Sequence, residues 1–392
     1  MRTETENGRT VIYLEGRIDT VNAPEIEREI NSVLDEAAGE PVLDGSGLEY
    51  ISSAGLRVLM KLRRRVGSPI EIRGLTPEVY EVFEMTGFTE LFTVSKRIRE
   101  LSVDGCKLIG QGFYGSVYRI DDETIVKVFR VPDSRAVIEE EKRKARIALV
   151  NGLPTAISYD IVRVGDSLGT VFELLNARSF NDLIIEQPEN IDSILEQYAG
   201  FLRLIHDTEI VSGDLPAAKD VYIGYADKLA DLLGSELSER IKALLRALPD
   251  DPYAVHGDYQ MKNVMLVNGE PMLIDMDTLS IGDRIFDLAA LFVTYRAYGE
   301  DEPENSMNFL GITADKTEYI FTKLLELYFG TEDKQRLADL TDRISVAGYL
   351  RFLYLVTSSE PETTTLGRLR REHSVQKLKA LAERVNDLRL GL

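Results

Sequence analysis

The fold class of this chain is decided by the stretch His256-Gly257-Asp258-Tyr259-Gln260-Met261-Lys262-Asn263. Four residues separate Asp258 from Asn263. This spacing is typical of a loop whose aspartate accepts a hydroxyl proton while its asparagine binds a metal ion. An acidic surface turn would explain the aspartate alone, so the interpretation depends on the residues before and after the loop.

A short β-hairpin is predicted directly after this loop. Val264 to Val267 has the pattern of a strand, Asn268-Gly269 is typical of a tight turn, and Met272 to Ile274 returns as the second strand. The return strand ends at Asp275, which is thereby placed beside Asn263. The two side chains offer hard oxygen ligands, so we expect them to bind a cation such as Mg²⁺.

A glycine-rich segment lies upstream, Leu108-Ile109-Gly110-Gln111-Gly112-Phe113-Tyr114-Gly115-Ser116-Val117-Tyr118. Gly110, Gly112 and Gly115 allow the backbone to approach phosphates closely, and backbone N–H groups can hold those phosphates. A glycine-rich hairpin turn is the alternative reading. A dinucleotide-binding motif would need a helix directly after Gly115, whereas an apolar strand containing Val117 follows.

The next strand, Ile125-Val126-Lys127-Val128-Phe129, places a lysine on an apolar face. A buried lysine is costly unless its charge is paired, and the alternative is an edge strand with a solvated lysine. The following helix carries Glu141 on its inward-facing stripe, so we expect Glu141, rather than Glu139 or Glu140, to pair with Lys127. Such a pair directs the lysine toward nucleotide phosphates.

From about residue 101 to residue 390 the chain resembles the aminoglycoside phosphotransferase and choline kinase family, a branch of the protein-kinase-like fold. The resemblance rests on His256-Gly257-Asp258, Ile274-Asp275 and Gly282-Asp283-Arg284-Ile285-Phe286-Asp287-Leu288-Ala289. It implies a bilobal α+β domain with a strand-rich N-terminal lobe and a mostly helical C-terminal lobe. The family uses ATP (sometimes GTP) with Mg²⁺ to phosphorylate hydroxyl groups of small molecules.

The resemblance also implies a role for each matching residue. Asp258 would be the catalytic base, Lys127 would contact the nucleotide phosphates, and Asn263 and Asp275 would bind Mg²⁺. His256 and Asp287 would support the catalytic loop. The remaining nucleotide contacts would come from the glycine loop, from the partner of Lys127 and from the hinge between the lobes: Gly110, Gly112, Gly115, Val117, Glu141, Glu173 and Leu175.

Two departures from protein kinases favour a small substrate. Gly257 stands where protein kinases carry the arginine that reads a phosphorylated activation loop. Between Asp275 and Asp287 there is almost no room for an activation segment. A protein substrate remains the alternative.

Residues 10–95 alternate between predicted strands and helices, which is typical of a small α/β domain with helices on one face of its sheet. A strand-rich segment and then a mostly helical segment follow. We therefore expect three parts: residues 1–97 as an α/β regulatory domain, residues 98–176 as the N-terminal lobe and residues 177–392 as the C-terminal lobe with substrate-binding helices.

The first part resembles the STAS domain of anti-sigma-factor antagonists through Gly16-Arg17-Ile18-Asp19 and Leu43-Asp44-Gly45-Ser46-Gly47-Leu48-Glu49-Tyr50-Ile51-Ser52-Ser53-Ala54-Gly55. The resemblance implies a protein partner and a reversible phosphorylation site at Ser53, two residues before Gly55. Many antagonists have an aspartate directly before this serine, where this chain has Ser52. A second reading makes Ser53 the N-cap of a helix that begins at Ala54.

The formal net charge of −20 argues against binding to nucleic acid or to anionic membranes. No signal peptide is evident, and the single Cys106 fits a reducing compartment, so we expect a cytoplasmic location. The longest apolar stretch, Leu288 to Tyr295, is too short to cross a bilayer. The acidic segment from Gly299 to Glu304 either attracts a cationic substrate or forms a solvated loop.

Two hypotheses follow for the function. The first is an ATP-dependent kinase for a small-molecule hydroxyl, regulated or localised through its N-terminal domain. The alternative is a partner-switching regulator of the anti-sigma-antagonist type, whose kinase-like domain senses nucleotide or phosphorylates a protein. The complete set of Lys127, Asp258, Asn263 and Asp275 favours the first hypothesis.

Overall fold

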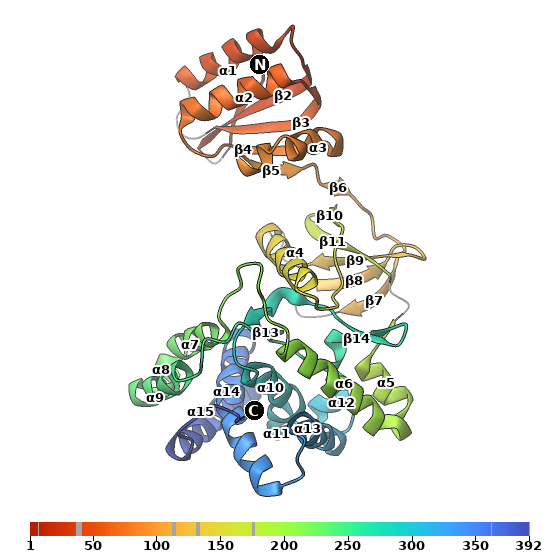
Figure 1. Ribbon diagram of the computed structural model, residues 1–392, viewed down its shortest axis with the longest axis vertical. Helices are drawn as coiled ribbons and strands as arrows, with labels where there is room; N and C mark the ends of the chain where they lie inside the picture. Colours follow the sequence, from red (N-terminus) through yellow and green to blue (C-terminus); the bar gives the residue numbers. More distant parts are fainter. Residues whose placement is uncertain are drawn as a thin grey trace. The chain divides into compact units, whose positions relative to one another are not determined.

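The computed structural model describes residues 1–6, 8–36, 41–111, 115–130, 134–174, 177–361 and 363–391. The chain forms two compact units, which Figure 1 shows with their helices and strands labelled. The first unit comprises Met1–Asp104 with Ile161–Gly169, and the second comprises Gly105–Asp160 with Thr170–Leu392. Within the described ranges, every helix is too short or too polar to span a lipid bilayer.

The first unit contains a five-stranded sheet in the order β1-β2-β3-β4-β5. Strand β1 is antiparallel to β2, and the remaining pairs are parallel. Parallel neighbours require crossover connections, and helices provide them here. The elements are β1 (Thr3–Glu6), β2 (Arg9–Ile18), α1 (Ala23–Glu36), β3 (Val42–Ile51), α2 (Ser53–Val66), β4 (Glu71–Leu75), α3 (Pro77–Met85), η1 (Phe88–Glu90) and β5 (Thr93–Lys96). A further parallel pair joins β6 (Arg99–Glu100) to β10 (Asp160–Val164).

The strand register separates the two faces of this sheet. Ile12, Leu43 and Ile72 are neighbours across β2, β3 and β4, and all three are fully buried against α1, α2 and α3. One residue further along the strands, Asp44 pairs with Arg73, whose Nε donates to Asp44 Oδ2 at 2.9 Å. One face therefore packs against the helices, as the sequence predicts, and the other face carries this ion pair.

Helix α2 begins one residue earlier than expected. Ser52 has an extended backbone (φ −90°, ψ 171°), and its hydroxyl accepts hydrogen bonds from the N–H groups of Ala54 and Gly55. The prediction that Ser53 is the N-cap is therefore wrong: Ser52 caps the helix, and Ser53 is its exposed first residue. Two adjacent serines offer the same hydroxyl group, and only the backbone conformation distinguishes the capping residue.

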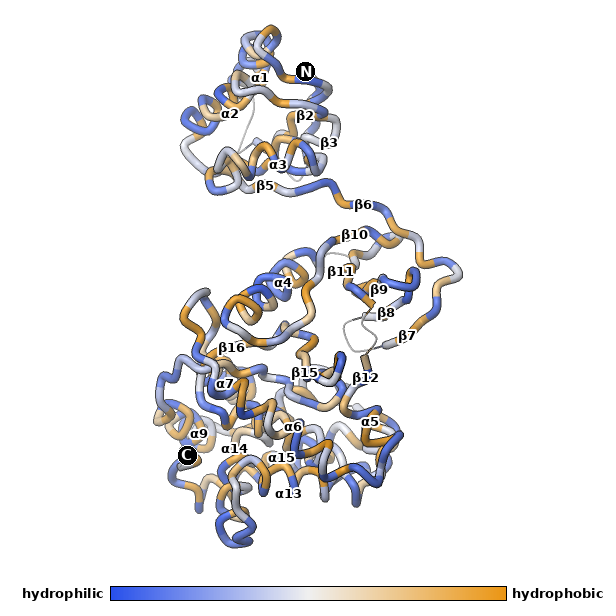
Figure 2. Tube along the Cα trace, turned by 45° about the vertical axis from the view of Figure 1, so that its right-hand side comes forward, coloured by the Kyte–Doolittle hydropathy of each residue, from blue (hydrophilic) through white to orange (hydrophobic). Residues whose placement is uncertain are grey.

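The second unit opens with strands β9, β8 and β7, which are neighbours in this order and pair in antiparallel fashion. Its elements are β7 (Lys107–Gln111), β8 (Gly115–Arg119), β9 (Thr124–Phe129), α4 (Arg135–Val150) and β11 (Ser167–Glu173). In Figure 2, orange and blue segments alternate along α4, as expected for a helix with one buried face. That buried face carries Ile138, Ala145 and Ala148.

The rest of the second unit is mostly helical, as predicted. Two small sheets, β12-β14-β15 and β13-β16, interrupt the helices. The helices and strands of this part are β12 (Ala177–Ser179), α5 (Phe180–Glu186), α6 (Ile191–His206), α7 (Ala218–Lys228), α8 (Ala230–Leu233), α9 (Ser235–Arg246), β13 (Ala254–Val255), β14 (Val264–Val267), β15 (Glu270–Leu273), β16 (Ser280–Ile281), α10 (Ile285–Phe292), α11 (Tyr298–Asp301), α12 (Glu304–Leu310), α13 (Ala314–Phe329), α14 (Lys334–Ser359) and α15 (Thr365–Arg384). Single turns of 3₁₀-helix lie at η2 (Pro188–Asn190), η3 (Met261–Asn263) and η4 (Met276–Thr278), and a π-helix, η5 (Val293–Ala297), continues α10.

The apolar stretch Leu288 to Tyr295 forms the centre of this helical core. All of α10 is buried, and it packs against the long helix α14. The close approach depends on Gly348 of α14, because a Cβ at this position would lie 2.3 Å from Cδ1 of Phe292. The α/β unit and the strand-rich and helical parts of the second unit together confirm the predicted fold class.

Candidate functional site

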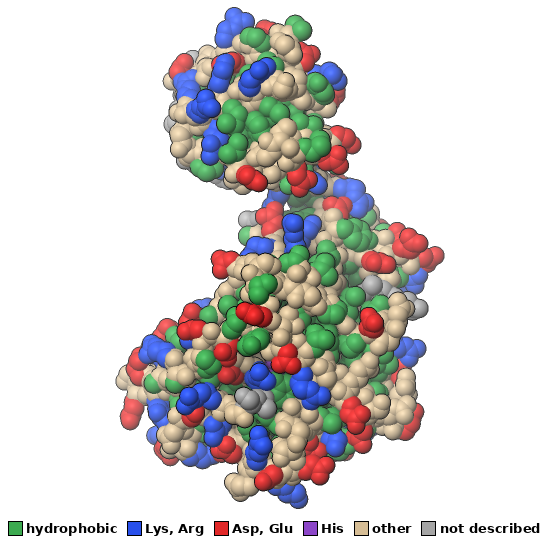
Figure 3. Space-filling view, in the orientation of Figure 1, with side chains coloured by type: hydrophobic (Ala, Val, Ile, Leu, Met, Phe, Trp, Pro, Cys, Tyr) green, Lys and Arg blue, Asp and Glu red, His purple; other side chains and the backbone are tan. Residues whose placement is uncertain are grey.

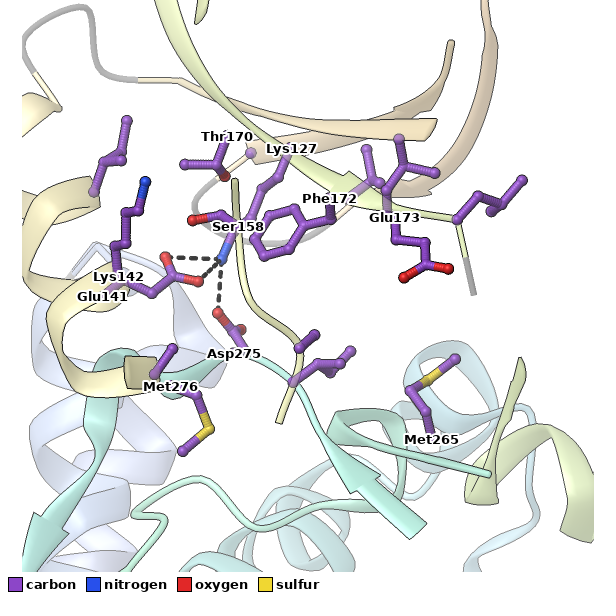
Figure 4. A pocket seen from close by; sticks show the side chains of 18 of the residues that line it. Lys127, Glu141, Lys142, Ser158, Thr170, Phe172, Glu173, Met265, Asp275 and Met276 are labelled. Carbon is purple, nitrogen blue, oxygen red and sulfur yellow. Dashed lines mark hydrogen bonds and ion pairs between the residues drawn. The ribbon is translucent and has the colours of Figure 1, made fainter. Parts of the chain in front are cut away.

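A cavity of about 450 Å³ lies in the second unit, a size that suits a small organic ligand. Apolar side chains line most of it, among them Val117, Phe172 and Met265. Figure 4 shows the charged groups Lys127, Glu141 and Asp275 gathered at one side of the cavity. The cavity therefore combines an apolar surface for a flat ring with a polar end for charged groups.

Lys127 joins the two carboxylates at this polar end. Its Nζ lies 3.1 Å from Glu141 Oε1 and 2.7 Å from Asp275 Oδ1. Burial alone would lower the pKa of Lys127, but the negative charges of Asp275 and Glu141 raise it, so the ammonium group stays charged. The predicted Lys127–Glu141 pair is confirmed.

The alternative partners for Lys127 are occupied elsewhere on α4. Glu139 accepts a hydrogen bond from Arg135, and Glu140 pairs with Arg143 at the surface. Glu141 is the one of the three whose carboxylate is mostly buried, with 11% of the side chain exposed. The position of Glu141 on the inward-facing stripe of α4 therefore predicted the partner of Lys127 correctly.

The glycine loop is described only in part. Gly115 has no room for a side chain, because a Cβ there would lie 2.1 Å from the carbonyl oxygen of Val128. Val117 is opposite Lys127 in the β8–β9 register and lines the cavity. A Cβ on Gly110 would make only ordinary contacts with Val117, so sterics do not demand glycine there. The predicted nucleotide contact Gly112 lies outside the described residues.

The described residues of the hinge that line the cavity are Phe172, Glu173 and Leu174. Glu173, at the end of β11, is exposed and lines the cavity rim. The next residue, Leu174, donates its backbone N–H to the carbonyl oxygen of Glu123 at 2.6 Å. The predicted contact Leu175 lies outside the described residues.

Asp258 lies in the loop after β13, and both of its carboxylate oxygens accept hydrogen bonds. Oδ2 accepts hydrogen bonds from the side-chain amides of Asn263, at 2.9 Å, and Gln260, at 3.1 Å. Oδ1 accepts one from Arg351 at 2.8 Å. The carboxylate is therefore fixed, while 30% of the side chain stays exposed.

A buried carboxylate holds the backbone of this loop. Asp287 is fully buried, and it accepts hydrogen bonds from the backbone N–H groups of His256, at 2.9 Å, and Gly257, at 2.6 Å, and from His206 Nε2 at 3.1 Å. Burial alone would raise the pKa of Asp287, but the hydrogen bond and charge of His206, together with His256, lower it below its ordinary value. Asp287 is therefore an ionised acceptor at the base of the loop.

His256 and Gly257 complete this support. His256 Nδ1 accepts from the N–H of Asp258, so Nε2 carries the proton and donates to the carbonyl oxygen of Ile274 at 3.1 Å. Gly257 has φ 82°, and a Cβ there would lie 2.7 Å from the carbonyl oxygen of Thr278. The loop therefore accepts neither an arginine nor any other side chain at this position.

The hairpin β14–β15 brings the two predicted metal ligands together. Asn268 (φ 52°) and Gly269 (φ 87°) form its tight turn, as predicted. The N–H of Ile274 donates to the carbonyl oxygen of Asn263 at 3.0 Å, so Asp275 follows directly beside Asn263. Asp275 is one of two described non-glycine residues with positive φ, at 63°, a conformation that costs energy and is often kept at functional sites.

The donor set of this pair suits a hard cation. Asn263 donates through its amide nitrogen to the carbonyl and the carboxylate of Asp258, which turns its amide oxygen away from that residue. Asp275 adds a carboxylate, and Mg²⁺ prefers oxygen ligands of these two kinds. Among the described side chains, no cluster of three or more His, Cys, Asp or Glu residues would hold a metal ion by itself. A metal bound here would therefore share its coordination with substrate phosphates.

The sequence pattern of the phosphotransferase enzyme family, APH, matches residues 105–315, more than half of the chain. The chain belongs to this phosphotransferase family. The pattern of the STAS domain matches residues 1–101. The protein is thus a STAS domain fused to a phosphotransferase domain, as the sequence predicts.

A curated protein and two solved structures are similar to parts of this chain. The STAS domain is 38% identical over 92 residues to BtrV of Bordetella bronchiseptica, provisionally described as an anti-sigma factor antagonist, and the match covers 23% of this chain and 79% of BtrV. A thermostable mutant of the aminoglycoside phosphotransferase APH(4)-Ia has a TM-score of 0.47 at 14% identity, covering 71% of this chain and 94% of its own. A choline/ethanolamine kinase family protein from Mesorhizobium loti has a TM-score of 0.46 at 15% identity, covering 72% and 89%.

The acidic segment after α10 is neither a solvated loop nor a free anionic surface. Tyr349 donates to Glu300, His373 contacts Asp301 at 2.9 Å, and Arg370 contacts Glu302 at 2.9 Å. Helices α14 and α15 supply all three partners, so the segment is part of the helical packing of the phosphotransferase domain. The segment is therefore not simply solvated, and its attraction of a cationic substrate stays a prediction.

We predict that Asp287→Asn destabilises the phosphotransferase domain by about 3 kcal/mol near neutral pH, because breaking a buried ionic hydrogen-bond set leaves its donors unsatisfied. The pKa of Asp287 is lower in the fold than its ordinary value of about 4. Its contribution is therefore complete above about pH 4 and is lost as the pH falls through the lower folded value. Denaturant unfolding at several pH values measures this difference.

Asp283→Asn is the matched control for this test. Asp283 accepts from the N–H of Ile285 at 2.8 Å, and an asparagine oxygen can accept the same bond. We expect a change within roughly 0.5 kcal/mol, as for substitutions that keep a site intact. Equal unfolding free energies for Asp287→Asn and the wild type would contradict the role of Asp287.

Proposed function

We propose that the protein is an ATP- and Mg²⁺-dependent phosphotransferase that moves a γ-phosphoryl group to the hydroxyl of a small molecule. The observation that carries the proposal is the convergence of Lys127, Asp258, Asn263 and Asp275 within one domain. The cavity between Lys127 and the hinge supports a nucleotide site, since its apolar lining suits a base and its polar end suits phosphates. Family membership supports phosphoryl transfer as the reaction.

Each residue has a task that its contacts support. Lys127, oriented by Glu141, would hold nucleotide phosphates. Asn263 and Asp275 would hold Mg²⁺, which when bound neutralises the charge on the phosphates. Asp258 would accept the proton of the acceptor hydroxyl, whose oxygen forms the new bond to phosphorus as the bond to the leaving ADP breaks. Because both oxygens of Asp258 are held by hydrogen bonds, the base keeps its orientation during this step.

The surroundings of Asp258 favour a small acceptor over a protein. Between Asp275 and Asp287 the chain forms only η4, β16 and the start of α10, which leaves no activation segment for docking a peptide. Gly257 has no space for the arginine that would read such a segment. Figure 3 shows acidic and basic side chains interspersed over the visible face of the phosphotransferase domain, without a large surface of one sign.

We predict that Asp258→Asn lowers phosphoryl transfer by at least about 100-fold, within the range of general-base contributions. Nucleotide affinity should change little, because Asp258 does not line the nucleotide cavity. Release of ADP measures transfer, and calorimetric titration with Mg²⁺-ATP measures affinity. Lys127→Ala is the comparison variant, and it should weaken productive binding of the phosphates.

Near-normal turnover by Asp258→Asn would remove Asp258 as the base. Nucleotide binding by the wild type without any turnover would instead favour the alternative function, a partner-switching regulator that senses nucleotide. Transfer to a protein and not to a small molecule would favour the protein-kinase form of that alternative.

We further propose that the STAS domain regulates or localises the enzyme through a protein partner. Ser53 is exposed at the start of α2, and Val21, with 89% of its surface exposed, lies in the turn after β2. The N–H of Ser52 donates to the carbonyl oxygen of Ile18 at 2.8 Å, which joins the ends of β2 and β3. An exposed apolar residue and an exposed hydroxyl, each shortly after the end of one of these two strands, support a partner surface that phosphorylation of Ser53 would alter.

We predict that Ser53→Asp folds normally but loses a partner that Ser53→Ala retains. A phosphate or carboxylate at the start of α2 interacts favourably with the positive end of the helix dipole, so the helix tolerates the charge. Binding to an anti-sigma factor, the partner class that the STAS resemblance suggests, is measured by calorimetry, with circular dichroism as the check of folding. Equal affinity of both variants for that factor would leave Ser53 without a regulatory role.

A further inference from the structure

Arg351 reaches the catalytic loop from α14, a helix that lies beyond the residues matched to the phosphotransferase family. Its Nη2 donates to Asp258 Oδ1 at 2.8 Å, and its Nη1 donates to the carbonyl oxygen of Gly257. Only 7% of the residue is exposed. One guanidinium group thus holds both the side chain of the proposed base and the backbone next to it.

The hydrogen bonds that Asp258 already accepts show which of its two carboxylate oxygens can accept one more. A carboxylate oxygen accepts about two hydrogen bonds. Asn263 and Gln260 occupy both acceptor positions of Oδ2, whereas Arg351 occupies one position of Oδ1. The remaining position of the carboxylate therefore belongs to Oδ1, the oxygen on the Arg351 side.

Stability alone gives little reason for an arginine at this place. A buried ion pair is often no more stabilising than well-packed apolar residues of similar volume. Nε of Arg351 has no hydrogen-bond partner among the described residues, which adds a cost. Burial would lower the pKa of Arg351, but Tyr222, Asp258 and Tyr225 raise it, so the group is a cation beside Asp258.

The backbone of α14 is placed to bring this side chain to the loop. Gly348, three residues before Arg351, lets α14 lie close against Phe292 of α10. Asp287 of the same α10 binds the N–H of Gly257, and Arg351 binds the carbonyl oxygen of Gly257. The peptide groups around Gly257 are therefore held from α10 and α14 together.

We propose that Arg351 is a positioning residue for phosphoryl transfer, and that the acceptor hydroxyl donates its proton to Oδ1 of Asp258. The inference rests on the proposed function, since it assigns Arg351 an action through Asp258. Arg351 holds the carboxylate in one orientation and leaves one acceptor position open. The acceptor molecule is then bound on the side of the loop that faces α14.

The test uses the full-length protein with Mg²⁺-ATP, with water as the acceptor and ADP release as the readout. Arg351→Lys keeps the positive charge but loses the two-point contact. We expect its kcat to fall about 100-fold, the loss that a misplacement near 1 Å can cause. The affinity for Mg²⁺-ATP should stay within about threefold, a difference below roughly 1 kcal/mol.

Two further measurements separate positioning from folding. In the Asp258→Asn background, Arg351→Lys should cause no additional loss, because its effect passes through Asp258. Free guanidinium ion should restore part of the kcat of Arg351→Ala. Arg370→Lys is the matched control: Arg370 is also buried, with 4% of its side chain exposed, and pairs with Glu360 and Glu302, yet makes no contact with Asp258. It should keep the wild-type kcat.

Each other outcome counts against the proposal. Wild-type turnover by Arg351→Lys, a full additional loss in the Asp258→Asn background, or an equal loss in Arg370→Lys would overturn the role of Arg351. A parallel loss of ATP binding would show that Arg351 is only structural. Full turnover by Asp258→Asn would instead reject the proposed function, and the inference about Arg351 would fall with it.

Discussion

The loop that carries Asp258 depends on a carboxylate that has no contact with solvent. An ionised group as deeply buried as Asp287 is tolerated only when hydrogen bonds replace its lost hydration. Asp287 obtains them from His206 and from the N–H groups of His256 and Gly257, and so fixes the backbone immediately before Asp258. The left-handed conformation of Gly257 and its close contact with Thr278 follow from the same arrangement. The orientation of Asp258 is thus set by residues that would never contact a substrate.

The residues proposed to bind nucleotide phosphates and metal likewise depend on contacts between separate elements. Lys127 comes from β9 and Glu141 from α4, whereas Asp275 follows the hairpin that Asn263 opens. Burial, reinforced by the charges of Asp275 and Glu141, raises the pKa of the neighbouring Asp277 to about 7. Three carboxyl groups, those of Glu141, Asp275 and Asp277, therefore lie in the electrostatic surroundings of Lys127. A cation and a polyphosphate that bind together would suit such a site, because each compensates the charge of the other.

Much of this site could be predicted from the sequence because its signals are local. The spacing from Asp258 to Asn263, the Asn268-Gly269 turn and the stripe of α4 that carries Glu141 each lie within one element. The role of Arg351 could not be predicted, because it contacts a residue 93 positions earlier in the chain. The strand β1 was missed because its four residues are polar and pair only along an edge of the sheet. The partners of the acidic segment were missed for the same reason as Arg351: they come from helices that the sequence does not place.

The central claim is that the assembled site transfers phosphate to a small alcohol. The most direct measurement is ³¹P nuclear magnetic resonance of the protein with Mg²⁺-ATP and a panel of amino alcohols, sugars and aminoglycosides. The account predicts that the γ-phosphate signal of ATP is replaced by that of a phosphomonoester of one acceptor, with ADP in equal amount, and that EDTA stops the change. ATP that stays intact with every acceptor, or phosphate that appears only on the protein, would contradict it.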